Sequence, residues 1–307
     1  AGTAGWGGFW GKGLEGTLGA VRVHTGYLTA EQILNNYEFE KDHYAPIPDG
    51  GPIAVAGELA VDLDAGDLTP GFVTDWPNRG ILGGFRPADN NVANPQSQVI
   101  LGVPAVNFAN NGDGLVCIDG APAGLVGDSA WTIEVWAYNP QIDGLETVVA
   151  IGDRPDNIAE FNIGTPLSFV TYSVGDAGWD QGPPPVGEWV HVAWTHRPAS
   201  EAPGDNGNGL IEIYVNGKLN TTFSGFTGPL NTHFGEAGAP ITIGSFRNST
   251  TGGWGGSYGL PLSGAISRVR IHTGYLTADE VLNNYYTEVD EFLGKPVVNV
   301  VSNWTLY

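Results

Sequence analysis

Hydrophobic and polar residues alternate with a period of two along much of this chain. The alternation is clearest in residues 131–136, WTIEVW, and in residues 190–195, VHVAWT. Because a period of two places successive side chains on opposite faces of a strand, each segment should bury one face. His191 and His196, which are five residues apart, should therefore lie on opposite faces of one strand.

Runs of β-branched and aromatic residues, separated by Gly, Pro and Asn, predict about thirteen strands. An Asn-Gly pair at 216–217 lies between two of these runs and is typical of a tight hairpin turn. So many short strands predict an all-β, two-sheet sandwich. The expected strands are residues 59–63, 99–101, 105–108, 115–118, 131–138, 147–151, 159–163, 167–173, 189–196, 209–215, 218–223, 240–245 and 265–271.

The chain contains one segment twice. Residues 5–41 and 253–289 align without gaps at a constant spacing of 248, as between His24 and His272, with 21 identities in 37 positions. Each copy predicts a strand, near 18–23 in the first, and then a short capping helix. The helices should begin at the capping boxes Thr29-Ala30-Glu31-Gln32 and Thr277-Ala278-Asp279-Glu280 and run about two turns. A repeat at fixed spacing predicts a tandem array of similar units, of which this chain would be one part.

Composition agrees with a β protein that has many turns: 47 Gly, 21 Pro and only 15% charged residues. The formal charge of −21 disfavours binding to nucleic acid or anionic membranes, whose phosphates would be repelled. We expect a soluble chain, because no apolar stretch approaches the roughly 20 residues of a membrane-spanning helix. Cys117 is the only cysteine, so no intrachain disulfide forms, and its apolar neighbours predict a buried thiol.

Five segments, taken in order, resemble one known family. They are SAWTIEVWAY (129–138), GEWVHVAWT (187–195), IEIYVNGKL (211–219), ITIGS (241–245) and LSGAISRVRIHTGYLTADEV (262–281). Their order is similar to that of the laminin-G-like subgroup of concanavalin A-like jelly rolls. The resemblance implies an extracellular or cell-surface protein with a two-sheet concanavalin A-like jelly-roll sandwich and short capping helices, of the kind that large secreted bacterial proteins carry in series. It does not imply one function, because this fold hosts lectins, adhesion modules, calcium-binding modules and glycoside hydrolases.

The repeat and the resemblance together predict the domain organisation. We interpret residues 1–46 as the closing segment of a preceding repeat unit, 47–58 as a linker and 59–290 as a laminin-G-like jelly roll. Residues 291–307 are expected to form an extended tail, either a docking strand or a linker to a next unit. Its valine-rich sequence suits addition to a sheet edge.

The sequence gives little support for catalysis. Retaining glycosidases need two carboxyl groups about 5–5.5 Å apart, whereas the strands here offer Glu134 and Glu212 singly. We expect both to be outward-facing carboxylates on half-exposed strands. No catalytic triad signature is present, and the six His residues show no zinc spacing. His272 and its copy His24 are expected to make structural hydrogen bonds, and the chain is predicted not to be an enzyme.

The resemblance implies a calcium ion at the sheet rim, because many relatives bind one there. The matching loop, residues 107–114, offers Asn110, Asn111 and Asp113 as oxygen ligands, although Ser267 stands where relatives carry an aspartate. The alternative for this loop is an Asn/Gly turn. The oxygen-rich residues 203–209 favour a hairpin connection over a second calcium loop, and Asp62, Asp64 and Asp67 predict a solvated acidic edge.

Exposed aromatic rings that stack on sugars would be the mark of a glycan site. Trp179, Trp254 and Tyr258, which lie in Gly-rich loops, are the candidates for glycan or inter-unit contact, whereas Trp131, Trp136, Trp189 and Trp194 are expected in the core. Asn220, Asn248 and Asn303 begin glycosylation sequons.

These observations leave three functions open. The first is an extracellular structural repeat unit that builds a filament, sheath or matrix by end-to-end association with copies of itself. The alternative is a carbohydrate-binding or adhesion module of a larger secreted protein, and the third is a glycoside hydrolase.

Overall fold

The chain divides into two compact units, Ala1–Asp49 and Gly50–Tyr307. The computed structural model describes residues 21–44, 51–87, 95–109, 114–117, 119–154, 157–171, 173–202, 204–248 and 257–294. In the first unit, residues 30–44 form helix α1 (Ala30–Tyr44), and the capping box at its start is present, with Gln32 N and Thr29 Oγ1 3.2 Å apart. The strand predicted near 18–23 is not formed in its described part, residues 21–23.

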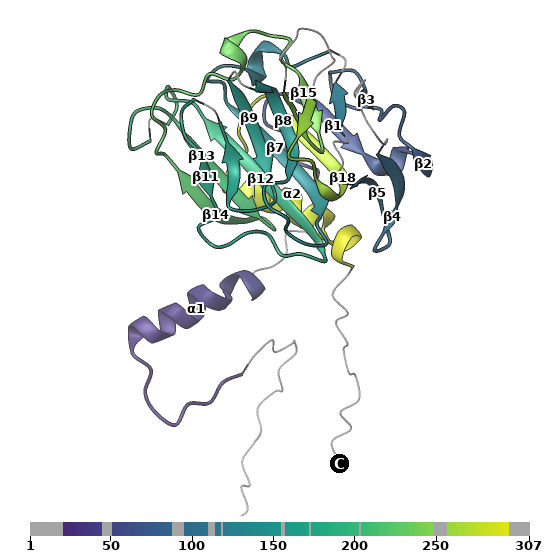
Figure 1. Cartoon of the computed structure of the whole chain (residues 1–307). Helices are drawn as coiled ribbons and strands as arrows, with labels where there is room; N and C mark the ends of the chain where they lie inside the picture. The colour runs from purple at the N-terminus through teal and green to yellow at the C-terminus, as the bar shows by residue number, and fades with distance from the viewer. Residues whose placement is uncertain are drawn as a thin grey trace, which may run out of the picture. The chain divides into compact units, whose positions relative to one another are not determined.

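The second unit contains two sheets packed face to face (Figure 1). The first sheet comprises β1 (Leu59–Asp64), β2 (Gly71–Phe72), β4 (Gln96–Ile100), β5 (Val103–Ala109), β7 (Trp131–Tyr138), β12 (Trp189–Arg197), β13 (Leu210–Val215), β14 (Lys218–Phe223) and β18 (Ser263–His272). Its strand order is β14-β13-β12-β7-β18-β5-β4-β2. The long strand β18 pairs with β5 through its first half and with β1 through its second half.

The second sheet comprises β3 (Phe85–Pro87), β6 (Leu115–Cys117), β8 (Thr147–Arg154), β9 (Ile158–Asn162), β10 (Leu167–Val170), β11 (Ala177–Gly178), β15 (Ile241–Ile243), β16 (Phe246–Asn248) and β17 (Ser257–Gly259). Its order is β11-β10-β9-β8-β15-β6-β3, with β16 parallel to β8 and β17 paired to β16. Single helical turns lie at η1 (Ala65–Asp67), η2 (Ala123–Leu125) and η3 (His233–Gly235).

The predicted fold class is therefore confirmed, and each of the thirteen expected strands overlaps an observed one. The strands that the sequence did not indicate are β2, β3, β11, β16 and β17, which have only two or three residues each. Asn216 and Gly217 both have positive φ, 51° and 73°, so the hairpin turn is of the mirror-image type that this pair favours.

The main core fills the space between the two sheets. Trp131 and Trp194 are at most 1% exposed there, and the ring of Trp131 meets Phe161 edge to face at 5.1 Å. Trp136 and Trp189 are equally buried but lie in a second cluster with Phe292. All four tryptophans expected to be buried are thus buried, although on two different faces of the first sheet.

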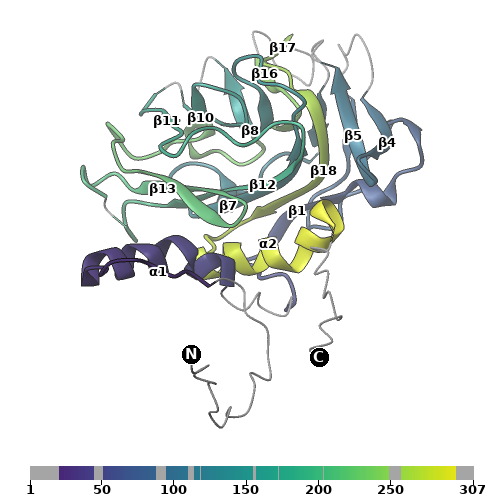
Figure 2. The same ribbon diagram turned by 90° about the horizontal axis from the view of Figure 1, so that it is seen from below.

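Helix α2 (Ala278–Leu293) covers the outer face of the first sheet beside β7, β12 and β18 (Figure 2). The expected helix of two turns ending near Asn-Asn-Tyr is wrong, because α2 has 16 residues. Apolar residues continue past the two asparagines, and Phe292 stacks on Trp136 with ring centroids 4.0 Å apart. Residues 291–293, predicted to be extended, are therefore helical, and 295–307 lie outside the described residues.

Residues 51–58, which the sequence predicts to be linker, are hydrogen-bonded to the end of β18 and to α2. Ala54 N donates to Asn284 Oδ1 at 2.7 Å, Ala56 N to His272 Nδ1 at 3.3 Å and Glu58 N to Thr273 Oγ1 at 2.9 Å. The linker prediction is therefore wrong for these residues. Their Pro and Gly content reflects an irregular backbone that is held by side chains of the repeated segment.

Candidate functional site

A buried polar cluster lies beneath α2, on the outer face of β7. Glu134 projects from β7 and meets His272 of β18, with Nε2 3.0 Å from Oε2, and Asn284 of α2, whose amide donates to the same oxygen at 3.0 Å. His191 of β12 lies 3.3 Å from the other oxygen. Each of these four side chains is at most 2% exposed.

The position of each member follows from strand register. Glu134 pairs with Ala193 on one side and Arg270 on the other, so residues of β12 and β18 on the same face flank its carboxylate. Glu134 faces outward from the sandwich as expected, but the expected half-exposed position is wrong, because α2 covers this face. His191 lies on this outer face and His196 beside Trp131 in the main core, so their predicted separation is confirmed.

The electrostatics of the cluster favour a charged carboxylate. Burial by itself raises the pKa of Glu134, but the imidazoles of His191 and His272 outweigh it and hold the pKa well below its ordinary value. Glu134 is thus a structural anion, inaccessible to a substrate. His272 makes the structural hydrogen bond expected of it, since its other ring nitrogen accepts from Ala56 N.

A second ionic cluster continues along α2. Glu288 binds Arg270 and accepts from the indole nitrogen of Trp136 at 2.8 Å, and Arg268 donates to it at 2.7 Å. Burial raises the pKa of Glu288, yet Arg270 overcomes this and keeps the pKa below its ordinary value. Both clusters therefore fix α2 to the sheet.

A groove of about 380 Å³ opens beside this cluster, between β1, β18 and α2. Arg79 projects into it and contacts Asp64 at 3.2 Å and Asp67 at 2.6 Å, while Arg268 lies 3.5 Å from Asp64. The solvated acidic edge predicted for these aspartates is wrong, since arginines distant in sequence pair with them. The groove is lined by Ile53, Val55, Leu59, Asp62, Asp64, Arg79, Arg268, Arg270, Thr287, Glu288 and Glu291.

This groove is large enough for a sugar-sized ligand and carries planar polar groups that hydrogen-bond hydroxyls. The sequence pattern gave no indication of it. Its arginines come from a loop and from β18, and its carboxylates from β1 and α2, so only the fold brings them together.

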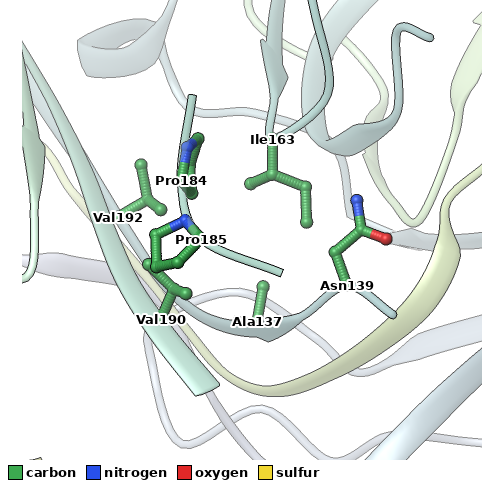
Figure 3. A pocket seen from close by; sticks show the side chains of 7 residues that line it. All are labelled: Ala137, Asn139, Ile163, Pro184, Pro185, Val190 and Val192. Atoms are coloured by element: carbon green, nitrogen blue, oxygen red, sulfur yellow. The ribbon is translucent and has the colours of Figure 1, made fainter. Parts of the chain in front are cut away.

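Trp179, the aromatic candidate with a described side chain, is half-buried against the main core. Its indole nitrogen donates to Gly164 O at 2.8 Å, which fixes the ring between two loops. The nearby pocket, formed by Ala137, Asn139, Ile163, Pro184, Pro185, Val190 and Val192, has about 10 Å³ of free space, enough for one water at most (Figure 3).

Several other predicted site residues lie outside the described residues or are described by their backbone position. Asn110, Asn111, Asp113, Trp254 and Asn303 lie outside the described residues, and the calcium site stays a prediction. Tyr258 is placed in β17 by its backbone, and Asn248 lies in β16.

The side-chain amide of Asn220 donates to Gly182 O at 3.0 Å. The residues at 204–209 lie in the connection between the antiparallel strands β12 and β13, as expected, and Asn206 and Asn208 there both donate to Phe226 O. Glu212 is paired with Arg197 at 3.1 Å.

Two features of the described residues concern metal binding and membrane insertion. No group of three His, Cys, Asp or Glu side chains in that part of the chain is arranged to hold a metal ion. Of the helices described, neither has the length and apolarity needed to cross a membrane.

Two solved structures with a TM-score above 0.5 support the fold. The chain is similar to domain 4 of AbnA, a GH43 extracellular arabinanase from Geobacillus stearothermophilus solved with arabinotriose, with TM-score 0.51 and 18% identity over 75% of this chain and 99% of that one. A mutant of HCR/D gives TM-score 0.51 and 10% identity, covering 76% and 53%. The binding domain of botulinum neurotoxin serotype D gives a TM-score of 0.49 and 10% identity, covering 76% of this chain and 52% of that one. The chain thus spans about half the length of the last two.

A search of the curated proteins found no match to this sequence. The family model of the concanavalin A-like lectin/glucanases superfamily, in its laminin-G form, matches residues 110–282. That range is more than half of the chain and contains the strands β7, β12 and β18 that hold the buried clusters. The chain therefore belongs to the laminin-G-like concanavalin A superfamily.

Proposed function

We propose that this chain is a noncatalytic building block of an extracellular assembly, in which jelly-roll units are joined end to end through the repeated closing segment. The observation that carries the proposal is the second copy of that segment. One jelly roll needs one β18 and one α2, and residues 263–293 already supply them. The first copy, residues 5–41, is thus surplus to the fold of this unit.

A noncatalytic role is supported by the state of the two candidate carboxylates. Glu134 is charged but sealed beneath α2, and Glu212 is held by Arg197. Neither side chain belongs to a pair of carboxylates open to a glycosidic bond. Extracellular location is supported by the family, whose laminin-G-like members are often extracellular, and the charge of −21 suits a hydrated surface.

Electron microscopy of material extracted from the native source tests this function. We expect filaments or sheets with a repeat of one jelly roll, whereas residues 51–307 expressed alone should stay monomeric. A calcium chelator added to the native material tests the site proposed at Asn110, Asn111 and Asp113, whose loss should loosen the assembly. Monodisperse native material would refute the assembly function.

The groove beside α2 favours a second candidate function, glycan binding. Its volume of about 380 Å³ accommodates a sugar ring, and the Arg79 side chain, which ends in a guanidinium, is 49% exposed. A glycan array probed with the full chain tests this function. Arg79→Ala should abolish a signal that arises in the groove, and Trp179→Ala a signal that arises at the loop rim. An array without signal would remove this candidate.

A further inference from the structure

The part of the first copy that corresponds to β18 exposes side chains that the second copy buries. Val21 and Val23 are 70% and 92% exposed. Their counterparts at the spacing of 248, Val269 and Ile271, lie in β18 and are 0% exposed, because β7 and β1 flank them and the second sheet covers them. The first copy thus keeps the apolar side chains that face the core in β18, but these side chains are exposed rather than packed in a core.

Helix α1 repeats the contrast. Ile33 and Tyr37 are 57% and 61% exposed, whereas Val281, the counterpart of Ile33 in α2, is fully buried against the sheet. Tyr285, the counterpart of Tyr37, stacks on Trp136 with centroids 5.8 Å apart. The docking face of the helix is therefore retained in the first copy.

Polar identities specify what this face would bind. His24 and Asn36 correspond to His272 and Asn284, the two side chains of the repeat that bind the carboxylate of Glu134. Buried polar groups are costly without partners, and in the second copy the imidazole and the amide both hold the Glu134 carboxylate as well as backbone groups of Ala54 and Ala56. Solvent-exposed positions would not require this pair.

A second pair of identities extends the match. Arg22 and Glu40 correspond to Arg270 and Glu288, which bind each other while Glu288 accepts from the indole of Trp136. Glu134 and Trp136 are two residues apart on one face of β7. The first copy therefore matches a strand with the spacing Glu-x-Trp.

We propose that residues 21–40 close the sheet of a second, open jelly roll of the same repeat. The segment lies antiparallel to that body's counterpart of β7, and His24 and Asn36 bind its buried glutamate. This inference rests on the proposed function and names the partner: a jelly roll whose own β18 and α2 do not occupy its β7 strand. Polar complementarity selects this occupant over a generic apolar surface.

Peptide capture during refolding tests the proposal. Residues 51–307 contain the whole described core of the second unit, and when unfolded in urea and diluted they pass through the open state. A fluorescent peptide of residues 1–49 should be captured and co-elute with the folded chain, as should a reference peptide of residues 253–294. His24→Ala with Asn36→Ala should weaken capture by about 100-fold. Glu31→Gln, at a position whose counterpart Asp279 is exposed, is the matched control and should bind as the parent peptide does.

A second measurement uses the full chain. His272→Ala with Asn284→Ala weakens the resident closing segment, and the proposal expects Tm to fall less in residues 1–307 than in residues 51–307, because the intact first copy can replace it. Adding His24→Ala and Asn36→Ala should remove this rescue. Equal losses of Tm at both lengths, or capture of the reference peptide without capture of residues 1–49, would overturn the proposal.

The two proposals fail separately. Native assemblies combined with no capture of residues 1–49 would leave the assembly function standing on another contact and overturn this inference. Capture of the peptide, together with native material that is monodisperse, would support this inference and refute the assembly function.

Discussion

Replacing Glu134 by alanine removes the central acceptor of the cluster beneath α2. The change leaves His191, His272 and the amide of Asn284 buried without their partner, all at 0% exposure. Removal of one member of a buried ionic network costs about 3–5 kcal/mol, because the remaining polar groups stay desolvated. For a domain of this size each kcal/mol lowers Tm by about 2–4 °C. We therefore expect a fall in Tm on the order of 6–20 °C.

Urea unfolding of the full chain, followed by tryptophan fluorescence, measures the loss of unfolding free energy, since Trp136 lies in the same buried layer. Thermal unfolding measures the fall in Tm. Glu212→Ala is the matched control, because Glu212 is also a strand glutamate paired with a basic group but keeps 21% of its side chain exposed. The control should lose no more than about 1 kcal/mol. A free energy of unfolding for Glu134→Ala within about 1 kcal/mol of the parent would refute the structural role of the cluster.

The same cluster predicts a dependence of stability on pH. The pKa of Glu134 is depressed in the folded chain relative to its ordinary value of 4.5, so its contribution is fully present above that value. As pH falls below it, the unfolded chain takes up a proton that the folded chain does not, and stability declines. Glu134→Gln should flatten the decline between about pH 5 and pH 3, measured as Tm at each pH.

Three further predictions concern the fold around the cluster. Thr277→Ala removes the capping box of α2 and should cost about 1 kcal/mol in urea unfolding, whereas Ala278→Ser should change stability by less than half as much. Gly244→Ala adds a Cβ 2.2 Å from the ring of Phe108 at a φ of +80°, so the variant should lose about 3 kcal/mol or more and accumulate poorly. Burial raises the pKa of the Cys117 thiol, so its labelling by a disulfide reagent should track global unfolding, and fast labelling in native buffer would contradict its burial.

The sequence predicted the sandwich well because strand signals are local. Alternation in WTIEVW and the Asn216-Gly217 pair each specify backbone geometry without knowledge of distant residues. The short strands β2 and β11 were not predicted, because a strand of two residues shows no periodicity in the sequence. Helix α2 was predicted too short because its last turns are stabilised by Trp136, which is more than 150 residues away in sequence.

The candidate site was predicted less well, for the same reason. The sequence around Glu134 predicts an exposed strand carboxylate, because it does not show that α2 covers this face. Asp64 is likewise predicted to lie on an acidic edge, because its pairing with Arg79 and Arg268 depends on the fold. One member of the cluster had a signal in the sequence: the identity of His24 with His272 predicted a structural hydrogen bond, although not its partner or the cluster. Pairings between distant segments require the fold itself.

Hydrogen exchange on the native assembly tests the central claim most directly. If the first copy closes another jelly roll, the amides of residues 21–37 should be protected in the assembly as strongly as those of residues 269–285, and should lose that protection in the isolated chain. Rapid exchange of residues 21–37 in intact native assemblies, with residues 269–285 protected, would contradict the account.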